Sequence, residues 1–131
     1  MTIPFWCLFV AAVLPYVWFS FAAPMRAAQF GKELDNHTPR AQDPKLLGRA
    51  ARLQGVHLNG LEALTYFAPA VIVAHLAHAN AVWSARLAVA FIILRLIHAF
   101  MYITDRPALR TAVFGVSLVT STALFVLAAC A

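Results

Sequence analysis

The chain has 131 residues, of which 63% are hydrophobic and only 11% are charged, and its formal net charge is +5. An ordinary soluble domain is roughly 45–50% apolar and about 25% charged, so this composition excludes a soluble globular domain and indicates an integral membrane protein. At about 20 residues per crossing, the length allows a single domain of four transmembrane helices. Nucleic-acid binding is not expected, because no soluble basic domain is present to support it.

The first predicted helix covers about residues 3–23 and is closed by Pro24. Arg26 is the first charged side chain, and a signal peptide needs cationic residues before its apolar run, so we expect a retained helix. Residues 26–44 form the one long polar stretch. Its two prolines, Pro39 and Pro44, predict a loop rather than the interior of a helix.

The second predicted helix runs from about residue 45 to 79. At 1.5 Å per residue it measures about 52 Å, whereas the hydrocarbon core of a bilayer is about 30 Å thick. Its first half is therefore expected to project from the membrane or to line a polar cavity. The third helix is expected at about 81–103 and the fourth at about 109–129. The predicted fold is an all-α bundle of four transmembrane helices in one domain, 1–131.

The basic residues predict the orientation, because cytoplasmic loops carry an excess of Lys and Arg. The loop near Asn80 has only Arg86 nearby. The other two loops and their flanks carry Arg26, Lys32, Arg40, Lys45, Arg49, Arg52, Arg106 and Arg110. We therefore expect a multi-pass protein of a bacterial inner membrane, with these two loops in the cytoplasm and both termini outside.

Polar residues of the second helix gather on one side. At 100° per residue, one sector about 80° wide holds Arg52, Gly55, Asn59, Glu62 and Tyr66. Charged and amide groups are costly in lipid, so each needs a buried partner or a function. This stripe is interpreted either as one wall of a binding site or as a structural set of ion pairs and hydrogen bonds between helices.

A second polar ridge lies on the third helix, where Arg95, His98 and Tyr102 are spaced three and four residues apart. It ends at the face that also carries Arg106 and Arg110. Two ridges that reach the same face are able to enclose an anionic ligand that water can approach. The alternative is that Arg95 extends to the interface or neutralises Glu62.

The remaining histidines and cysteines give weaker signals. His57 points away from the stripe and is expected to be a hydrogen-bonded packing residue or to face a loop. His75 and His78 share a helix face but have no third ligand nearby, so no metal site is predicted. Packing as small apolar side chains is favoured over a disulfide for Cys7 and Cys130.

The sequence resembles the MAPEG family, the membrane-associated proteins in eicosanoid and glutathione metabolism. The resemblance rests on Gly55-Val-His57-Leu-Asn59-Gly-Leu-Glu62, on Tyr66-Phe67-Ala68-Pro69, on Arg95-Leu-Ile-His98-Ala-Phe-Met-Tyr102 and on Arg110-Thr111. It covers essentially the whole chain. It implies a homotrimer of four-helix subunits with glutathione bound between subunits near the cytoplasmic face, and a hydrophobic small molecule or lipid as the second partner.

The resemblance also implies roles for individual residues. Arg110 would activate the glutathione thiol, with Thr111 as an additional hydroxyl donor. The remaining candidate ligand-binding residues are Arg52, Asn59, Glu62, Arg95, His98 and Tyr102. Arg52 suits a carboxylate of the tripeptide, because the arginine fork matches carboxylate geometry.

Three positions depart from or vary within the family pattern. Gly55 stands where many members have an arginine, Phe114 where several have a tyrosine, and His98 where the family varies between His and Tyr. Two functions are therefore carried forward. The first is a glutathione-dependent transferase or peroxidase that acts on hydrophobic electrophiles. The alternative is a non-catalytic membrane protein that binds a lipid or another anion in the same cleft.

Overall fold

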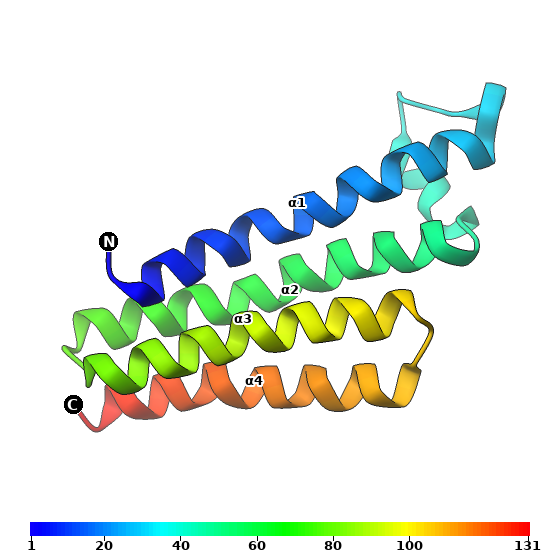
Figure 1. Cartoon of the computed structure of the whole chain (residues 1–131). Helices are drawn as coiled ribbons and strands as arrows, with labels where there is room; N and C mark the ends of the chain where they lie inside the picture. The colour runs from blue at the N-terminus through cyan, green and yellow to red at the C-terminus, as the bar shows by residue number, and fades with distance from the viewer.

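The computed structural model describes all residues 1–131 and contains four long α-helices (Figure 1). They are α1 (Ile3–Phe30), α2 (Gly48–Leu76), α3 (Ala81–Ile103) and α4 (Pro107–Ala129). Each is long and apolar enough to cross a membrane. The prediction of a four-helix membrane bundle is confirmed. Both termini lie at one end of the bundle, and the loop between α1 and α2 lies at the other (Figure 1).

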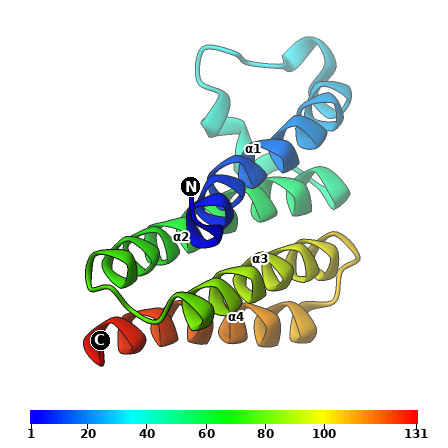
Figure 2. The ribbon, with the colours of Figure 1, turned by 60° about the vertical axis from the view of Figure 1, so that its left-hand side comes forward.

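The helices pack so that α2 and α3 form the centre. α1 contacts α2 and α3, while α4 contacts α3 and α2, and α1 and α4 do not contact each other. Figure 2 shows α1 and α4 on opposite sides of the central pair. The rings of Phe67 in α2 and Phe91 in α3 stack with centroids 3.9 Å apart. Around them, small residues such as Ala70, Ala74 and Ala88 are buried, and small side chains let helix backbones approach closely.

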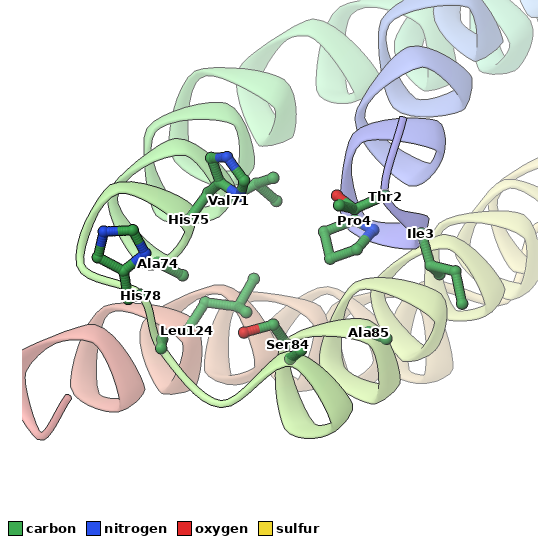
Figure 3. A pocket seen from close by; sticks show the side chains of 12 residues that line it. Thr2, Ile3, Pro4, Val71, Ala74, His75, His78, Ser84, Ala85 and Leu124 are labelled. Atoms are coloured by element: carbon green, nitrogen blue, oxygen red, sulfur yellow. The ribbon is translucent and has the colours of Figure 1, made fainter.

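Only 24 of the 131 residues are buried in the single chain, and many large apolar side chains point outward. Trp6, Phe9, Ile93 and Val119 are each more than half exposed. Such a surface would be unstable in water but is the expected one for helices that contact lipid or neighbouring helices. A cavity remains between the helices at the end of the bundle that carries both termini (Figure 3).

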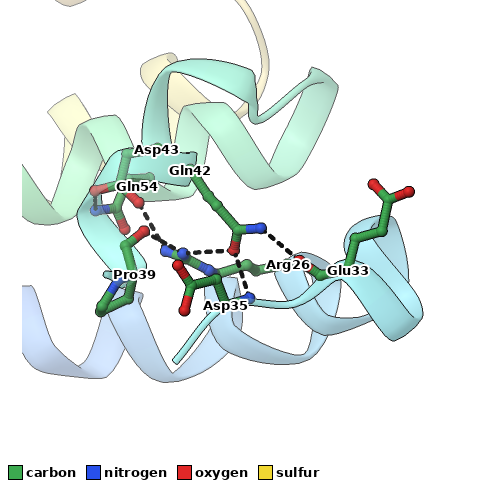
Figure 4. Close-up of polar contacts among 7 residues, drawn as sticks. All are labelled: Arg26, Glu33, Asp35, Pro39, Gln42, Asp43 and Gln54. Atoms are coloured by element: carbon green, nitrogen blue, oxygen red, sulfur yellow. Dashed lines mark hydrogen bonds and ion pairs between the residues drawn. The ribbon is translucent and has the colours of Figure 1, made fainter. Parts of the chain in front are cut away.

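The first helix is longer than the sequence predicts. Pro24 lies inside α1, which continues to Phe30. A proline removes one backbone donor from the helix but need not end it when other contacts hold the chain. Arg26 supplies such contacts: its guanidinium pairs with Asp43 at 2.7 Å and donates to Gln42 at 3.2 Å and to the carbonyl of Pro39 (Figure 4).

The loop that follows is also more ordered than a polar proline-rich stretch suggests. Gly31–Glu33 and Pro39–Lys45 form short 3-10 helices. Gln42 donates to the carbonyl of Glu33 at 2.7 Å and accepts from the backbone of Asp35 at 3.0 Å. These bonds close the loop on itself (Figure 4).

The second helix is correspondingly shorter than predicted. It begins at Gly48 rather than near Lys45 and ends at Leu76 rather than at Ala79. Lys45 belongs to a 3-10 helix that contains Pro44, and Gly48 has a positive φ of 57°, a conformation that glycine adopts without steric cost. At its other end His78 also has a positive φ, 55°. The 29 residues of α2 span about 43 Å, which still exceeds the hydrocarbon thickness.

Candidate functional site

A polar pocket of about 380 Å³ opens between α2, α3 and α4, toward the end that carries the loop between α1 and α2. Its size falls within the usual range for small-molecule sites, about 300–1,000 Å³. All of the predicted site residues except Arg52 and Arg95 line this pocket. The lining consists of Gly55, Leu58, Asn59, Glu62, His98, Tyr102, Arg110, Thr111 and Phe114.

The wall formed by α2 contains a hydrogen-bonded chain centred on Asn59. Its Oδ1 accepts from Nη2 of Arg95 at 2.6 Å, and its Nδ2 donates to Oε2 of Glu62 at 3.4 Å. No direct ion pair joins Arg95 to Glu62. The simple alternative, in which Arg95 neutralises Glu62 by contact, is therefore not what the structure shows. Asn59 connects the two charges and fixes its own amide orientation in doing so.

Arg95 lies behind the pocket rather than in it. Its side chain is buried, with 6% of the residue exposed, and it lines a narrow space with Pro15, Val56 and Gly60. Its Nη1 has no hydrogen-bond partner. A buried guanidinium is costly unless it is hydrogen-bonded, so the bond to Asn59 makes Arg95 a support for the pocket wall. In this chain it does not contact the pocket space directly.

The wall formed by α3 carries His98 and Tyr102, whose rings meet edge to face with centroids 5.7 Å apart. His98 is only 2% exposed and also packs near the ring of Phe114, at 6.2 Å. Its Nδ1 is buried without a partner. A buried ring nitrogen without a partner is an exception among buried polar groups, most of which are hydrogen-bonded.

Arg110 supplies the positive charge of the pocket. Its guanidinium carbon lies 4.3 Å from the centroid of the Tyr102 ring, a cation–π contact that holds the group over α3. No acidic side chain pairs with Arg110. The neighbouring hydroxyl of Thr111 donates to the carbonyl of Pro107 at 3.0 Å and retains its lone pairs as acceptors. The pocket thus contains one carboxylate, Glu62, and one unpaired guanidinium.

Arg52 does not line the pocket; its side chain contacts the end of α3 and the turn that follows. Its Nε donates to the carbonyl of Ile103 at 3.1 Å, and its Nη1 lies 3.7 Å from Oδ2 of Asp105. These contacts attach the start of α2 to the end of α3, where helix carbonyls lack intrahelical partners. The structure therefore places Arg52 outside the pocket. Helical spacing alone does not predict these contacts, because packing of the two helices brings Asp105 to Arg52.

Gly55 has no side chain, and Tyr102 fills the space beside it. A Cβ at position 55 would overlap the Tyr102 hydroxyl oxygen and lie 2.6 Å from Cζ of that ring. Leu58 and Phe114 complete the lining; neither was a predicted site residue, since apolar side chains at these positions resemble ordinary lipid-facing ones.

The other candidate residues lie apart from the pocket. His57 is buried and donates from Nδ1 to the carbonyl of Pro15 at 2.9 Å, which confirms the prediction of a hydrogen-bonded packing residue. No cluster of three possible metal ligands occurs. Both cysteines are free, Cys7 buried and Cys130 exposed.

The fold and the site define an integral membrane protein with a polar, charged pocket built between three of its four helices. Residues 3–130 match the model of the MAPEG family. The chain therefore belongs to that family. No curated protein and no solved structure matches it.

Proposed function

We propose that this protein is a membrane-bound glutathione-dependent transferase or peroxidase that acts on hydrophobic electrophiles. The observation that carries the proposal is the unpaired guanidinium of Arg110, held over Tyr102 in a pocket that also contains Glu62. When bound, glutathione would supply a thiolate that attacks an electrophilic atom. A fixed cation beside the sulfur favours the thiolate over the thiol.

The residues of the pocket fit the functional groups of glutathione. The Glu62 carboxylate suits the α-ammonium group of the tripeptide. The Arg110 guanidinium suits the sulfur or a carboxylate, and the imidazole of His98 lines the same pocket. Asn59 would hold Glu62 in position, and Arg95 would hold Asn59 from behind the pocket. Electrophiles dissolved in the bilayer would reach the pocket through the apolar side of Phe114 and Leu58.

We further propose a homotrimer with the pocket at the contact between subunits. In the single chain Glu62, Leu58 and Thr111 are exposed although they line the pocket. A charged carboxylate in the middle of a transmembrane helix is not stable against lipid, so a second copy of the chain is the natural cover. The two basic loops would lie in the cytoplasm, and the pocket would then lie near that face.

A second candidate is a membrane protein that binds a lipid or another anion in the same cleft without catalysis. Two observations favour it. The side chain of Arg52 contacts Ile103 and Asp105 instead of lining the pocket, and position 55 is a glycine without a functional group. Arg110 is therefore the one arginine in the pocket lining. Such a protein would have the same cleft and the same trimer but would not catalyse a reaction.

Calorimetry of the purified protein with glutathione in detergent tests both candidates. Saturable binding is expected, and Glu62→Gln should weaken it about tenfold, because a charge-assisted hydrogen bond contributes about 1.5–3 kcal/mol. Glu33→Gln, which removes an exposed carboxylate in the loop, is the matched control and should bind normally. No heat of binding at millimolar glutathione would exclude the transferase and favour the second candidate. An oligomer that falls apart on Glu62→Gln while binding persists would assign Glu62 a structural role.

A further inference from the structure

A second cavity lies at the opposite end of the bundle, where both termini are found. Its volume is about 450 Å³, and it is built by all four helices of one chain and the turn between α2 and α3. Figure 3 shows Thr2 and Pro4 of the first segment on one wall and His75 of α2 on the facing wall, with Leu124 of α4 and Ser84 of α3 forming the floor. This cavity shares no lining residue with the polar pocket.

Four polar side chains line this otherwise apolar cavity, those of Thr2, His75, His78 and Ser84. Ser84 is only 7% exposed, and its hydroxyl oxygen is buried without any hydrogen-bond partner. A buried hydroxyl without a partner costs free energy, so a ligand that bonds to it would remove that cost. His75 and His78 also line the cavity. The ring of His75 is held by an edge-to-face contact with Phe5, with centroids 4.8 Å apart.

The side chains that line this cavity carry no negative charge. The acidic residues of the chain are Glu33, Asp35, Asp43, Glu62 and Asp105, and none of them lines the cavity. The nearest along α2, Glu62, precedes His75 by more than three helical turns. The polar side chains that line the cavity are therefore two hydroxyls, those of Thr2 and Ser84, and two imidazoles. Each of these groups is able to donate a hydrogen bond.

We propose that this cavity binds the head of a membrane-soluble monocarboxylate, such as a fatty acid. Ser84, His75 and His78 would hold the carboxylate oxygens, and the apolar walls formed by Ile3, Val71 and Leu124 would contact the adjoining methylene groups. The proposal does not depend on the function proposed for the polar pocket, because the two sites lie at opposite ends of the helices.

The depth of the cavity supports this class of ligand. His75 lies in the last turn of α2, and Ser84 lies in the first turn of α3, so the polar groups sit where transmembrane segments meet the polar interface. The head of an amphiphile lies at the same depth while its chain extends into the hydrocarbon. A metal ion is a poorer match, because no third ligand accompanies the two imidazoles.

Nuclear magnetic resonance of dodecanoate labelled with ¹³C at the carboxyl carbon tests the proposal on the full chain in non-ionic detergent. A saturable second carboxyl resonance, one equivalent per chain, is expected in addition to the micellar one. His75→Gln and Ser84→Ala should each weaken this binding about fivefold or more, because each removes a hydrogen bond to a charged group. Dodecanol, with the same chain and no charge, should bind more weakly.

Two control variants distinguish the cavity from other cationic sites. Arg110→Ala alters the polar pocket, and His37→Gln removes an exposed imidazole from the loop at the far end; both should leave dodecanoate binding unchanged. The proposal is overturned if no second resonance appears, if dodecanol binds as tightly, or if the cavity variants have no effect. It is equally overturned if Arg110→Ala abolishes binding, since the carboxylate would then occupy the polar pocket.

Discussion

The phenol of Tyr102 occupies the space that a side chain at position 55 would need. A Cβ added to Gly55 would overlap the Tyr102 hydroxyl oxygen and lie 2.6 Å from Cζ of its ring. Atoms cannot approach so closely, so either the ring or the helix must move. The same ring carries the guanidinium of Arg110 at 4.3 Å. Gly55 therefore determines the position of Arg110 through Tyr102, although Gly55 itself has no functional group.

Gly55→Ala is expected to destabilise the protein by about 1–3 kcal/mol, the usual cost of overpacking. Displacement of the Tyr102 ring, over which Arg110 lies, should weaken binding in the polar pocket at the same time. Thermal unfolding in detergent and glutathione calorimetry measure the two effects. Gly115→Ala is the matched control, since nothing lies within 4 Å of a Cβ at that position in α4. It should stabilise the helix by about 0.5–1 kcal/mol. Equal stability of the two variants would contradict the packing argument.

Acid should selectively affect the loop between α1 and α2. The hydroxyl of Thr38, followed by the backbone N–H groups of His37 and Thr38, donates to Asp35 and lowers the pKa of its carboxyl below the ordinary 3.8. A lowered pKa in the folded state means that Asp35 contributes to loop stability above pH 4 and that the contribution is lost as pH falls through the folded-state value. Thr38→Val should raise the pKa of Asp35 toward 3.8, as measured by carboxyl ¹³C titration. Thr104→Val, in the other basic loop, should not change it.

The orientation is tested by cysteine labelling, for which the chain supplies an internal reference. Native Cys130 is exposed at the end of the bundle with both termini, whereas Ala41 is exposed in the loop at the other end. In cells, a membrane-impermeant maleimide should label Cys130 directly. It should label Ala41→Cys, placed in a Cys130→Ser background, only after the cells are opened. Labelling of Ala41→Cys in intact cells would place the basic loop and the polar pocket outside.

The number of helices and the two polar ridges follow from the sequence because they depend on local composition and on helical spacing. The contacts that modify this pattern join residues far apart in the chain. Pro24 does not end α1 because Arg26 is held by Asp43. The side chain of Arg52 does not join the other residues of the stripe in the pocket, because it contacts the carbonyl of Ile103 and the carboxylate of Asp105. Helical spacing put Arg52 in the same sector as Glu62, but it says nothing about which partner lies across the helix interface.

The phenylalanine at the edge of the polar pocket gives a test of where the sulfur of glutathione would lie on the proposed function. Phe114 borders both the pocket and a smaller space that extends toward Phe91 and Ser117. Phe114→Tyr adds one hydroxyl with little change in volume. If the sulfur is bound near Arg110, the new donor should raise turnover of a model electrophile about fivefold, the equivalent of one hydrogen bond of about 1 kcal/mol. Unchanged turnover with normal glutathione binding would place the sulfur away from α4.

Arg110 is expected to control reactivity more than affinity. Its guanidinium is unpaired within the chain, so a thiolate brought into the pocket would be its strongest partner. A free cysteine thiol has a pKa of about 8.5, and each unit by which a cation lowers it corresponds to about 1.4 kcal/mol between the two protonation states. Arg110→Ala should therefore raise the pKa of the thiol of bound glutathione, which is measured from thiolate absorbance as a function of pH. Turnover should fall by about tenfold or more, and glutathione affinity should fall less.

Arg110→Lys separates the charge of this residue from its shape. Lysine keeps the positive charge but loses the planar fork and the stacking on Tyr102. Compared with Arg110→Ala, Arg110→Lys should therefore recover part of the lowering of the thiol pKa and a smaller part of the turnover. Arg106→Ala is the matched control, because Arg106 is an exposed arginine of the same turn that does not line the pocket. If Arg110→Ala leaves the thiolate titration unchanged, or if the wild-type protein never lowers the thiol pKa, the transferase mechanism is wrong. Binding without activation would then make this pocket a site for an anionic or lipid ligand alone.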